Sequence, residues 1–230
     1  MARLQHCLNN KKLTLIVSLP ANDASLARAA LEAGADGLKT HCNVGHRASG
    51  SRFGPLDEYE AEFRRIRDSF DGPLGIVPAG SLEDARPEEI ARLAPLGFDF
   101  YSIYAHHLPS FMLKDIGLER TFAISDRYDL ARLPRTFPHG IAALEASIVP
   151  GEEYGAPLSF ADLIKYRYLV ERVELPVLVP SQRKLVPDDV PALADTGIKA
   201  IMLGAVVAGS TEESLRRAVA GFREAIDKWT

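Results

Sequence analysis

The sequence predicts a single (β/α)8 barrel. Eight short runs rich in apolar and β-branched residues alternate along the chain with longer segments in which apolar residues recur every three or four positions. The chain has 230 residues, which suits eight strand–helix units and leaves no room for a second domain. We therefore expect residues 1–230 to form one domain.

The apolar runs are the predicted strands. Each is short enough for a barrel strand and ends close to a glycine, a proline or a polar residue, as strands in such units do. In chain order, the runs are 13–20, 36–42, 73–80, 98–105, 121–126, 140–149, 175–181 and 199–205.

The segments between the runs are predicted helices, at 22–34, 56–70, 86–97, 160–173, 187–197 and 210–229. The segments 107–117 and 127–139, which follow the fourth and fifth strands, are short and interrupted by proline, so we expect only weak helices there. Boundary signals support the other helices: the caps Asn22 or Asp23 and Ser210, the first-turn prolines Pro87 and Pro187, and the terminal glycines Gly34, Gly97 and Gly197.

An open, doubly wound sheet is the alternative fold. The first predicted strand of that fold is commonly followed by a G-x-G-x-x-G loop, but this chain has "SLPANDAS" at residues 18–25. The missing glycine pattern favours the barrel.

The composition excludes several classes of function. Hydrophobic residues make up 47% and charged residues 25%, and the formal charge of −4 is not gathered into a basic block, so a nucleic-acid-binding surface is not expected. No apolar run has the ~20 residues needed to cross a bilayer, and residues 1–12 lack the apolar core of a signal peptide. We expect a cytoplasmic protein in which Cys7 and Cys42 are free thiols.

Chemically competent side chains fall at the carboxyl ends of the predicted strands, where the active sites of such barrels lie. Because strand side chains alternate between two faces, Lys39 and His41 should point into the barrel mouth, as should Ser18. On the sixth strand, Glu145 and Ser147 share the inward face. Lys39 and Glu145 should then face each other across the mouth.

A lysine and a glutamate in a partly buried pocket change each other's proton affinity, which general acid–base catalysis or imine formation requires. We predict Lys39, Glu145 and His41 as catalytic residues. Two alternatives stay open: a structural ion pair that fills a polar layer of the barrel, and a histidine that only packs and forms hydrogen bonds.

Further polar residues follow the fourth and fifth strands. We expect either His106 or His107 to enter the site, and Asp126 to act as an acid or to cap the following turn. His41, one of the paired histidines and Glu145 are an acceptable ligand set for zinc or manganese, but no close histidine spacing supports a metal. We predict no cofactor and leave a divalent metal open.

The segment 43–55 is longer than most strand–helix connections and combines glycines with basic side chains. Glycines allow close approach of the backbone to an anion, and arginine binds carboxylate or phosphate through two N–H groups. We predict a lid or clamp without secondary structure, against the alternative of a flexible surface insertion. The residues concerned are Gly45, Gly50 and Gly54 with His46, Arg47 and Arg52.

Residues 175–214, "LPVLVPSQRKLVPDDVPALADTGIKAIMLGAVVAGSTEES", resemble the terminal part of the ribulose-phosphate-binding class of TIM barrels, which includes sugar-phosphate epimerases and indole-glycerol-phosphate synthase. The resemblance implies a phosphate bound by backbone N–H groups after the seventh and eighth strands. That class has glycines after the seventh strand, where this chain has "PSQRK", so the charge of Arg183 or Lys184 would have to compensate. The implied phosphate contacts are Ser181, Gln182, Gly204 and Ala205.

Two other resemblances concern the chemistry. Flavin-binding barrels use the same corner for the FMN phosphate, which keeps a flavin open as a cofactor. Residues 13–41 resemble the opening of the orotidine-monophosphate decarboxylase group, but the Asp-x-Lys pattern of its third strand is absent from "GIVPAGS". Class I aldolases carry their imine-forming lysine on strand six, where this chain has Glu145.

We predict an isomerase, epimerase or lyase that acts on a small phosphorylated, carbohydrate-like metabolite by acid–base or imine chemistry. The alternatives are an FMN-dependent oxidoreductase and a non-catalytic barrel that binds a phosphorylated ligand. We expect no nucleic-acid or membrane partner and leave a homodimer open. The predicted ligand-binding residues are Ser18, Arg47, Arg52, His106, Ser181, Gln182, Arg183, Gly204 and Ala205.

Overall fold

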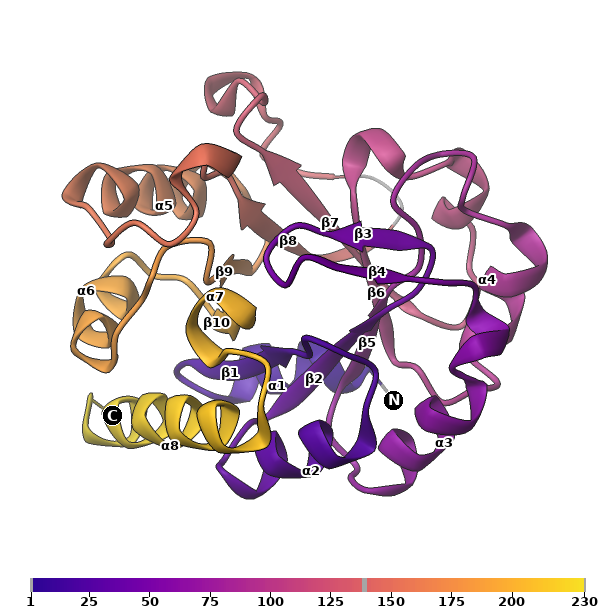
Figure 1. The fold of residues 1–230 in the computed structure, drawn as a ribbon. Helices are drawn as coiled ribbons and strands as arrows, with labels where there is room; N and C mark the ends of the chain where they lie inside the picture. Colours follow the sequence, from indigo (N-terminus) through magenta and orange to yellow (C-terminus); the bar gives the residue numbers. More distant parts are fainter. Residues whose placement is uncertain (1, 138–139, 230) are drawn as a thin grey trace.

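Eight parallel strands close into a barrel in the computed structural model, which describes residues 2–137 and 140–229 (Figure 1). The predicted (β/α)8 TIM barrel is thereby confirmed, and the open-sheet alternative is excluded because the first and last strands pair with each other. Around the barrel the order is β1 (Thr14–Ser18), β2 (Gly37–His41), β5 (Leu74–Val77), β6 (Phe100–Tyr104), β7 (Glu119–Ser125), β8 (Ile141–Ser147), β9 (Val177–Pro180) and β10 (Ala200–Leu203).

Helices surround the barrel in the six segments where they are predicted. In the described parts of the two proline-interrupted segments only short 3₁₀ turns form, as expected; the second segment ends at residues 138 and 139, outside the described residues. No described helix combines the length and apolarity needed to cross a bilayer. The outer helices are α2 (Ala24–Glu32), α3 (Glu60–Asp68), α4 (Pro87–Leu93), α5 (Phe160–Arg172), α6 (Val190–Asp195), α7 (Ala205–Ala208) and α8 (Glu212–Trp229).

The predicted boundary signals explain where several helices start and stop. The Asp23 carboxylate caps α2 by accepting the backbone N–H groups of Ser25 and Leu26. Asn22, the other predicted cap, instead forms two hydrogen bonds with the backbone of His41 at the end of β2. Asn22 therefore fixes the end of a strand that contributes to the barrel mouth.

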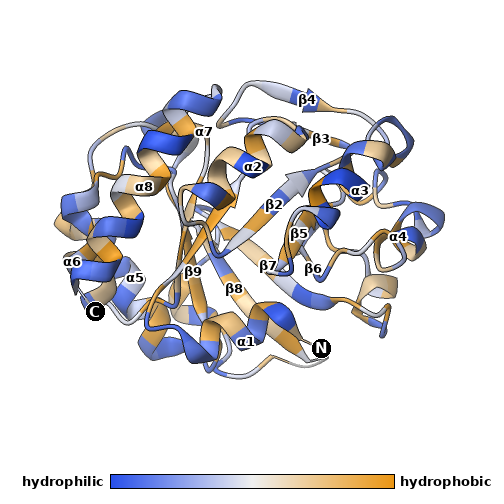
Figure 2. Cartoon of the chain, turned by 90° about the horizontal axis from the view of Figure 1, so that it is seen from below, coloured by the Kyte–Doolittle hydropathy of each residue, from blue (hydrophilic) through white to orange (hydrophobic). Residues whose placement is uncertain are grey.

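An additional helix, α1 (Arg3–Asn10), closes the amino-terminal end of the barrel, and the sequence pattern did not reveal it. Its Leu4 and Leu8 are fully buried and join an apolar cluster with side chains of the barrel interior such as Phe100 and Met202. Figure 2 shows α1 lying across this end, below apolar strands. The barrel is therefore open only at its carboxyl end among the described residues, where the cavity lies.

The connection between β2 and α3 is a β-hairpin, formed by β3 (Val44–His46) and β4 (Ser51–Phe53). The prediction that this segment lacks secondary structure is wrong, because the two short stretches pair in antiparallel register. At its base, Asn43 adopts a positive φ of 51°, and its amide donates to Glu89 at 2.5 Å. In Figure 1 the hairpin lies over the barrel opening.

Candidate functional site

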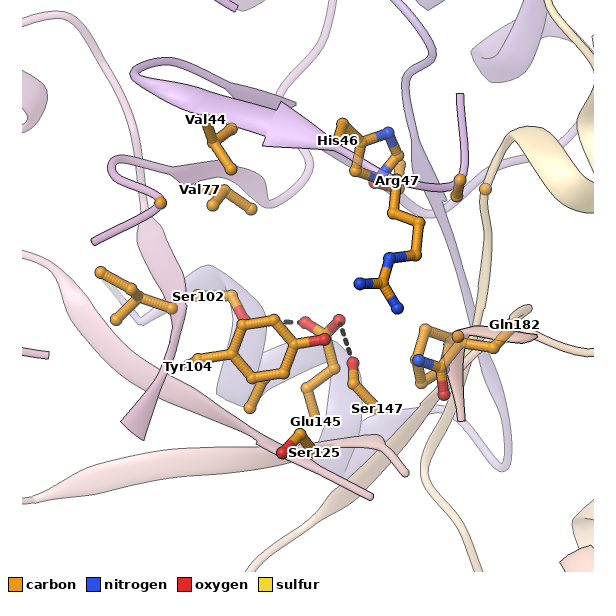
Figure 3. A pocket seen from close by; sticks show the side chains of 18 of the residues that line it. Val44, His46, Arg47, Val77, Ser102, Tyr104, Ser125, Glu145, Ser147 and Gln182 are labelled. Atoms are coloured by element: carbon orange, nitrogen blue, oxygen red, sulfur yellow. Dashed lines mark hydrogen bonds between the residues drawn. The ribbon is translucent and has the colours of Figure 1, made fainter. Parts of the chain in front are cut away.

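A cavity of about 620 Å³ occupies the carboxyl end of the barrel, under the hairpin. Side chains from the strand ends form its floor, the hairpin forms one wall, and the loops after β6, β7 and β8 form the opposite side (Figure 3). The lining includes Ser18, Lys39, His41, His46, Arg47, Ser102, Tyr104, His106, His107, Asp126, Arg127, Glu145, Ser147, Tyr154, Ser181, Gln182 and Gly204.

Lys39 and Glu145 form an ion pair on the cavity floor. Lys39 Nζ lies 3.1 Å from Glu145 Oε1 and 2.9 Å from Oε2, and both residues are almost fully buried. Strand alternation correctly predicts that these two side chains face each other from β2 and β8. Because both border a cavity, a ligand that enters can touch the charged groups.

Two serine hydroxyls complete the surroundings of Glu145. Ser102 Oγ donates to Oε2 at 2.7 Å, and Ser147 Oγ donates to Oε1 at 3.2 Å. Burial alone would raise the pKa of Glu145, but the charge of Lys39 and the hydrogen bonds from Lys39 and both serines outweigh it and lower the pKa. Glu145 is therefore a carboxylate at neutral pH.

His41 lies next to this pair and is 1% exposed. Its Nε2 is 3.3 Å from Ser18 Oγ, whereas the buried Nδ1 has no hydrogen-bond partner among the described residues. Burial lowers the pKa of His41 well below its ordinary value, and the nearby His46 and Lys39 lower it further. His41 is consequently a neutral imidazole at physiological pH.

The hairpin contributes His46 and Phe53, whose rings pack on His41. The ring centroids of His41 and His46 are 4.4 Å apart, and those of His41 and Phe53 are 4.7 Å apart. Burial, with a smaller contribution from Lys39 and against the attraction of Glu145, lowers the pKa of His46 to about 4. This aromatic contact ties the hairpin to the end of β2.

Tyr104 and Tyr154 add hydroxyl groups that the sequence reasoning missed. Burial is the main reason why the pKa of Tyr104 is raised, with Tyr154 and Glu145 adding to it. The hydroxyl of Tyr154 accepts a hydrogen bond from Gln182 Nε2 at 2.5 Å. Strand alternation could have found Tyr104, since it lies two residues after Ser102 on β6, but Tyr154 follows a 3₁₀ turn and has no such signal.

The corner formed by the ends of β9 and β10 is occupied by the chain's own hydrogen bonds. The backbone N–H of Gly204 donates to Ser181 Oγ at 2.8 Å, and the N–H of Ser181 donates to Met202 O at 2.8 Å. The backbone N–H of Gln182 donates to Pro180 O, and its side-chain carbonyl accepts from the N–H of Val149. The N–H groups of Ser181, Gln182 and Gly204, three of the four residues that the resemblance assigns to a phosphate, already have partners.

Solved structures resemble this fold at low sequence identity. Thiamine phosphate pyrophosphorylase from Pyrococcus furiosus is 17% identical over 95% of this chain and 97% of its own, with a TM-score of 0.63. A mutant tryptophan synthase α-subunit from the same organism is 16% identical over 92% of this chain and 98% of its own, with a TM-score of 0.71. Tryptophan synthase from M. tuberculosis is 15% identical over 96% of this chain and 95% of its own, with a TM-score of 0.69.

No protein-family model and no curated protein sequence matches the chain. The structural likeness, at identities this low, establishes the barrel fold that these proteins share.

The predicted ligand-binding residues separate into two groups in the structure. Ser18, Arg47, His106, Ser181, Gln182 and Gly204 line the cavity. Arg52, Arg183 and Ala205 are not among its lining residues.

For two of the residues outside the lining, the structure gives a physical reason. Arg52 is exposed on β4. Arg183 forms an ion pair with Asp162 at 3.0 Å and also binds Glu153. Its charge is therefore not directed to the corner at the ends of β9 and β10, where it was expected. Ala205 begins α7 next to Gly204.

The paired histidines both reach the cavity, although only one of them is predicted to do so. Their ring centroids are 4.2 Å apart, and His106 Nδ1 lies 3.2 Å from the hydroxyl of Tyr128. Asp126 is exposed at the cavity rim. In the described residues no three His, Cys, Asp or Glu side chains are grouped as metal ligands, so the ligand set considered above does not assemble.

Proposed function

We propose that the protein is an enzyme that moves a proton on a carbon next to the carbonyl group of a small phosphorylated, carbohydrate-like metabolite. The reaction is an isomerisation, an epimerisation or a lyase reaction. The observation that carries the proposal is the buried Lys39–Glu145 pair at the floor of an open cavity. Burying two charges is costly, and a pair that only filled the core would not need to border a ligand-sized space.

In the proposed reaction, an N–H of the Lys39 ammonium donates to the carbonyl oxygen of the substrate. The C–H bond next to the carbonyl breaks, its proton passes to a Glu145 oxygen, and its electron pair forms an enolate whose oxygen is stabilised by Lys39. Glu145 then returns the proton to the same carbon, or to the former carbonyl carbon when the hydroxyl proton of the first carbon passes to the former carbonyl oxygen, so that the first carbon carries the new carbonyl group. The lowered pKa of Glu145 keeps the carboxylate ionised before the substrate binds.

The hydroxyl groups of Ser102 and Ser147 position the Glu145 carboxylate through hydrogen bonds. His41 adds no positive charge beside the Lys39–Glu145 pair, because its lowered pKa keeps it neutral. One structural neighbour, thiamine phosphate pyrophosphorylase, is named after a phosphorylated compound. This supports a phosphorylated substrate for the same kind of barrel mouth.

Proton exchange in heavy water tests the proposal. A panel of phosphorylated hydroxy-aldehydes and hydroxy-ketones is incubated with the protein in D2O, and loss of the C–H signal is followed by NMR. We expect exchange on at least one compound and a loss of ~100-fold or more for Lys39→Met and Glu145→Gln. Lys165→Met, which removes an exposed lysine of α5, serves as the control.

The double variant Lys39→Met/Glu145→Gln removes both charges together and avoids leaving one of them buried alone. If it folds and retains exchange, the assignment of the pair is wrong. Borohydride treatment with each carbonyl compound, followed by mass spectrometry, separates an imine on Lys39 from simple proton transfer, since only an imine is reduced to a stable adduct.

A further inference from the structure

Arg47 is a cation of the cavity with no partner of its own. Within the described residues Arg47, which is exposed at the cavity, forms no ion pair or hydrogen bond, whereas Lys39 on the cavity floor is bound to Glu145. Figure 3 shows the Arg47 guanidinium pointing from the hairpin into the space between Glu145 and Gln182. A guanidinium without a counter-ion that faces a ligand-sized cavity is suited to an anionic group of the ligand.

Gly151, in the loop after β8, makes room for this guanidinium. A Cβ at residue 151 would lie 1.6 Å from Arg47 Nη1. Gly151 does not have a positive φ, so its backbone does not require glycine. Its lack of a side chain therefore matters for the space that Arg47 occupies.

The hairpin that carries Arg47 is anchored at several points. The N–H of Asn43 donates to Gly54 O at 2.8 Å, and the N–H of Gly80 donates to Asn43 O at 2.9 Å. Ser51 Oγ on the second hairpin strand donates to Pro20 O at 3.2 Å. Arg47 thus extends from a fixed support, so less entropy is lost when its side chain binds a ligand.

We propose that the phosphate of the substrate binds to Arg47, between the hairpin and the loop that contains Gly151, and not at the corner of β9 and β10. The proposal rests on the proposed function for the identity of the anion. It is favoured over the corner because the N–H groups of Ser181, Gln182 and Gly204 already donate within the chain. Arg47 offers a pair of parallel N–H donors that match two phosphate oxygens.

The test follows the Nε–H signals of the arginines by NMR while inorganic phosphate is added to the whole protein. The Arg47 signal is identified by its loss in Arg47→Gln. We expect it to shift with phosphate, and we expect Arg47→Gln to weaken phosphate binding by ~10- to 100-fold. Arg52→Gln, on the same hairpin but outside the cavity, should bind as the unaltered protein does.

Gly151→Ala adds a test of the position of the guanidinium. It should weaken phosphate binding, and Arg47→Gln/Gly151→Ala should bind no worse than Arg47→Gln alone, since the added methyl acts through Arg47. A parallel titration with acetate separates phosphate from a carboxylate: a stronger response to acetate overturns the assignment to phosphate.

Phosphate that shifts the backbone signals of Gly204 and Ala205 but leaves Arg47 unchanged overturns the proposal, and so does the absence of any response. These outcomes are distinct from a failure of the proposed function. If proton exchange depends on Lys39 but not on Arg47, only the proposed anion site is wrong. If phosphate binds at Arg47 but no compound is turned over, only the proposed reaction is wrong.

Discussion

Glu145 gathers Lys39, Ser102 and Ser147 around one carboxylate because these side chains share the inward face of their strands and the strands end at the same rim. All three donors would have to be rearranged if the carboxylate were lost. The same arrangement fixes the direction in which Lys39 points, and the proposed reaction requires such a fixed direction for the lysine to polarise a substrate oxygen.

The histidines near this pair make the stability of the fold depend on pH. The pKa of His46 is about 4 in the folded chain, against an ordinary value of 6.5. Below pH 6.5 the unfolded chain binds a proton at His46 that the folded chain does not bind. The free energy of unfolding therefore has its full value above that pH, as far as His46 is concerned, and falls as the pH decreases towards 4. His41 acts in the same direction.

We expect His46→Gln to make this decline shallower, because the variant has no proton to gain at residue 46 on unfolding. The measurement is the free energy of unfolding by urea across the same pH range. His6→Gln, which alters an exposed histidine of α1, is the control. An unchanged slope in His46→Gln would show that His46 does not contribute.

Among the elements, the β3–β4 hairpin has Asn43 at its base. Asn43 holds a positive φ of 51° and binds Glu89 through its amide at 2.5 Å. Most residues that carry a Cβ are strained at a positive φ, whereas glycine adopts this conformation freely and asparagine adopts it more readily than other residues.

Asn43→Ala should destabilise the protein by ~1–3 kcal/mol, since alanine adopts a positive φ less readily than asparagine and the hydrogen bond to Glu89 is lost. Asn43→Gly loses the same hydrogen bond but relieves the backbone, so its cost should be smaller. Urea unfolding measures both, and limited proteolysis reports whether the hairpin opens. Equal stability of Asn43→Ala and the unaltered chain would contradict this account.

At the scale of the whole molecule, α1 completes the core from below. Leu8 is fully buried against the barrel interior, so Leu8→Ala should lower the free energy of unfolding by ~2–5 kcal/mol. The binding of phosphate should not change, because α1 lies at the opposite end from the cavity. Gln5→Ala, an exposed neighbour on the same helix, should be neutral by the same urea measurement.

The features that the sequence predicts are those that depend on local periodicity. Alternation of strands and helices predicts the barrel, and alternation along single strands places Lys39 opposite Glu145. Both follow from geometry that repeats within a few residues.

The missed features depend on pairing between distant segments. The hairpin arises from antiparallel pairing of two very short stretches, and the occupied corner arises because Ser181 Oγ meets the N–H of Gly204 across neighbouring strands. Tyr154 reaches the cavity from a turn whose conformation has no periodic signal. The roles of the site residues in catalysis and binding stay predictions.

Among the described residues α1 covers the amino-terminal end of the barrel, so the cavity is reached from the carboxyl end. In the proposed reaction, substrate and product would therefore use the same route to and from the cavity. A product that stays bound at the cavity floor would then inhibit the reaction by competing with the substrate for the same site.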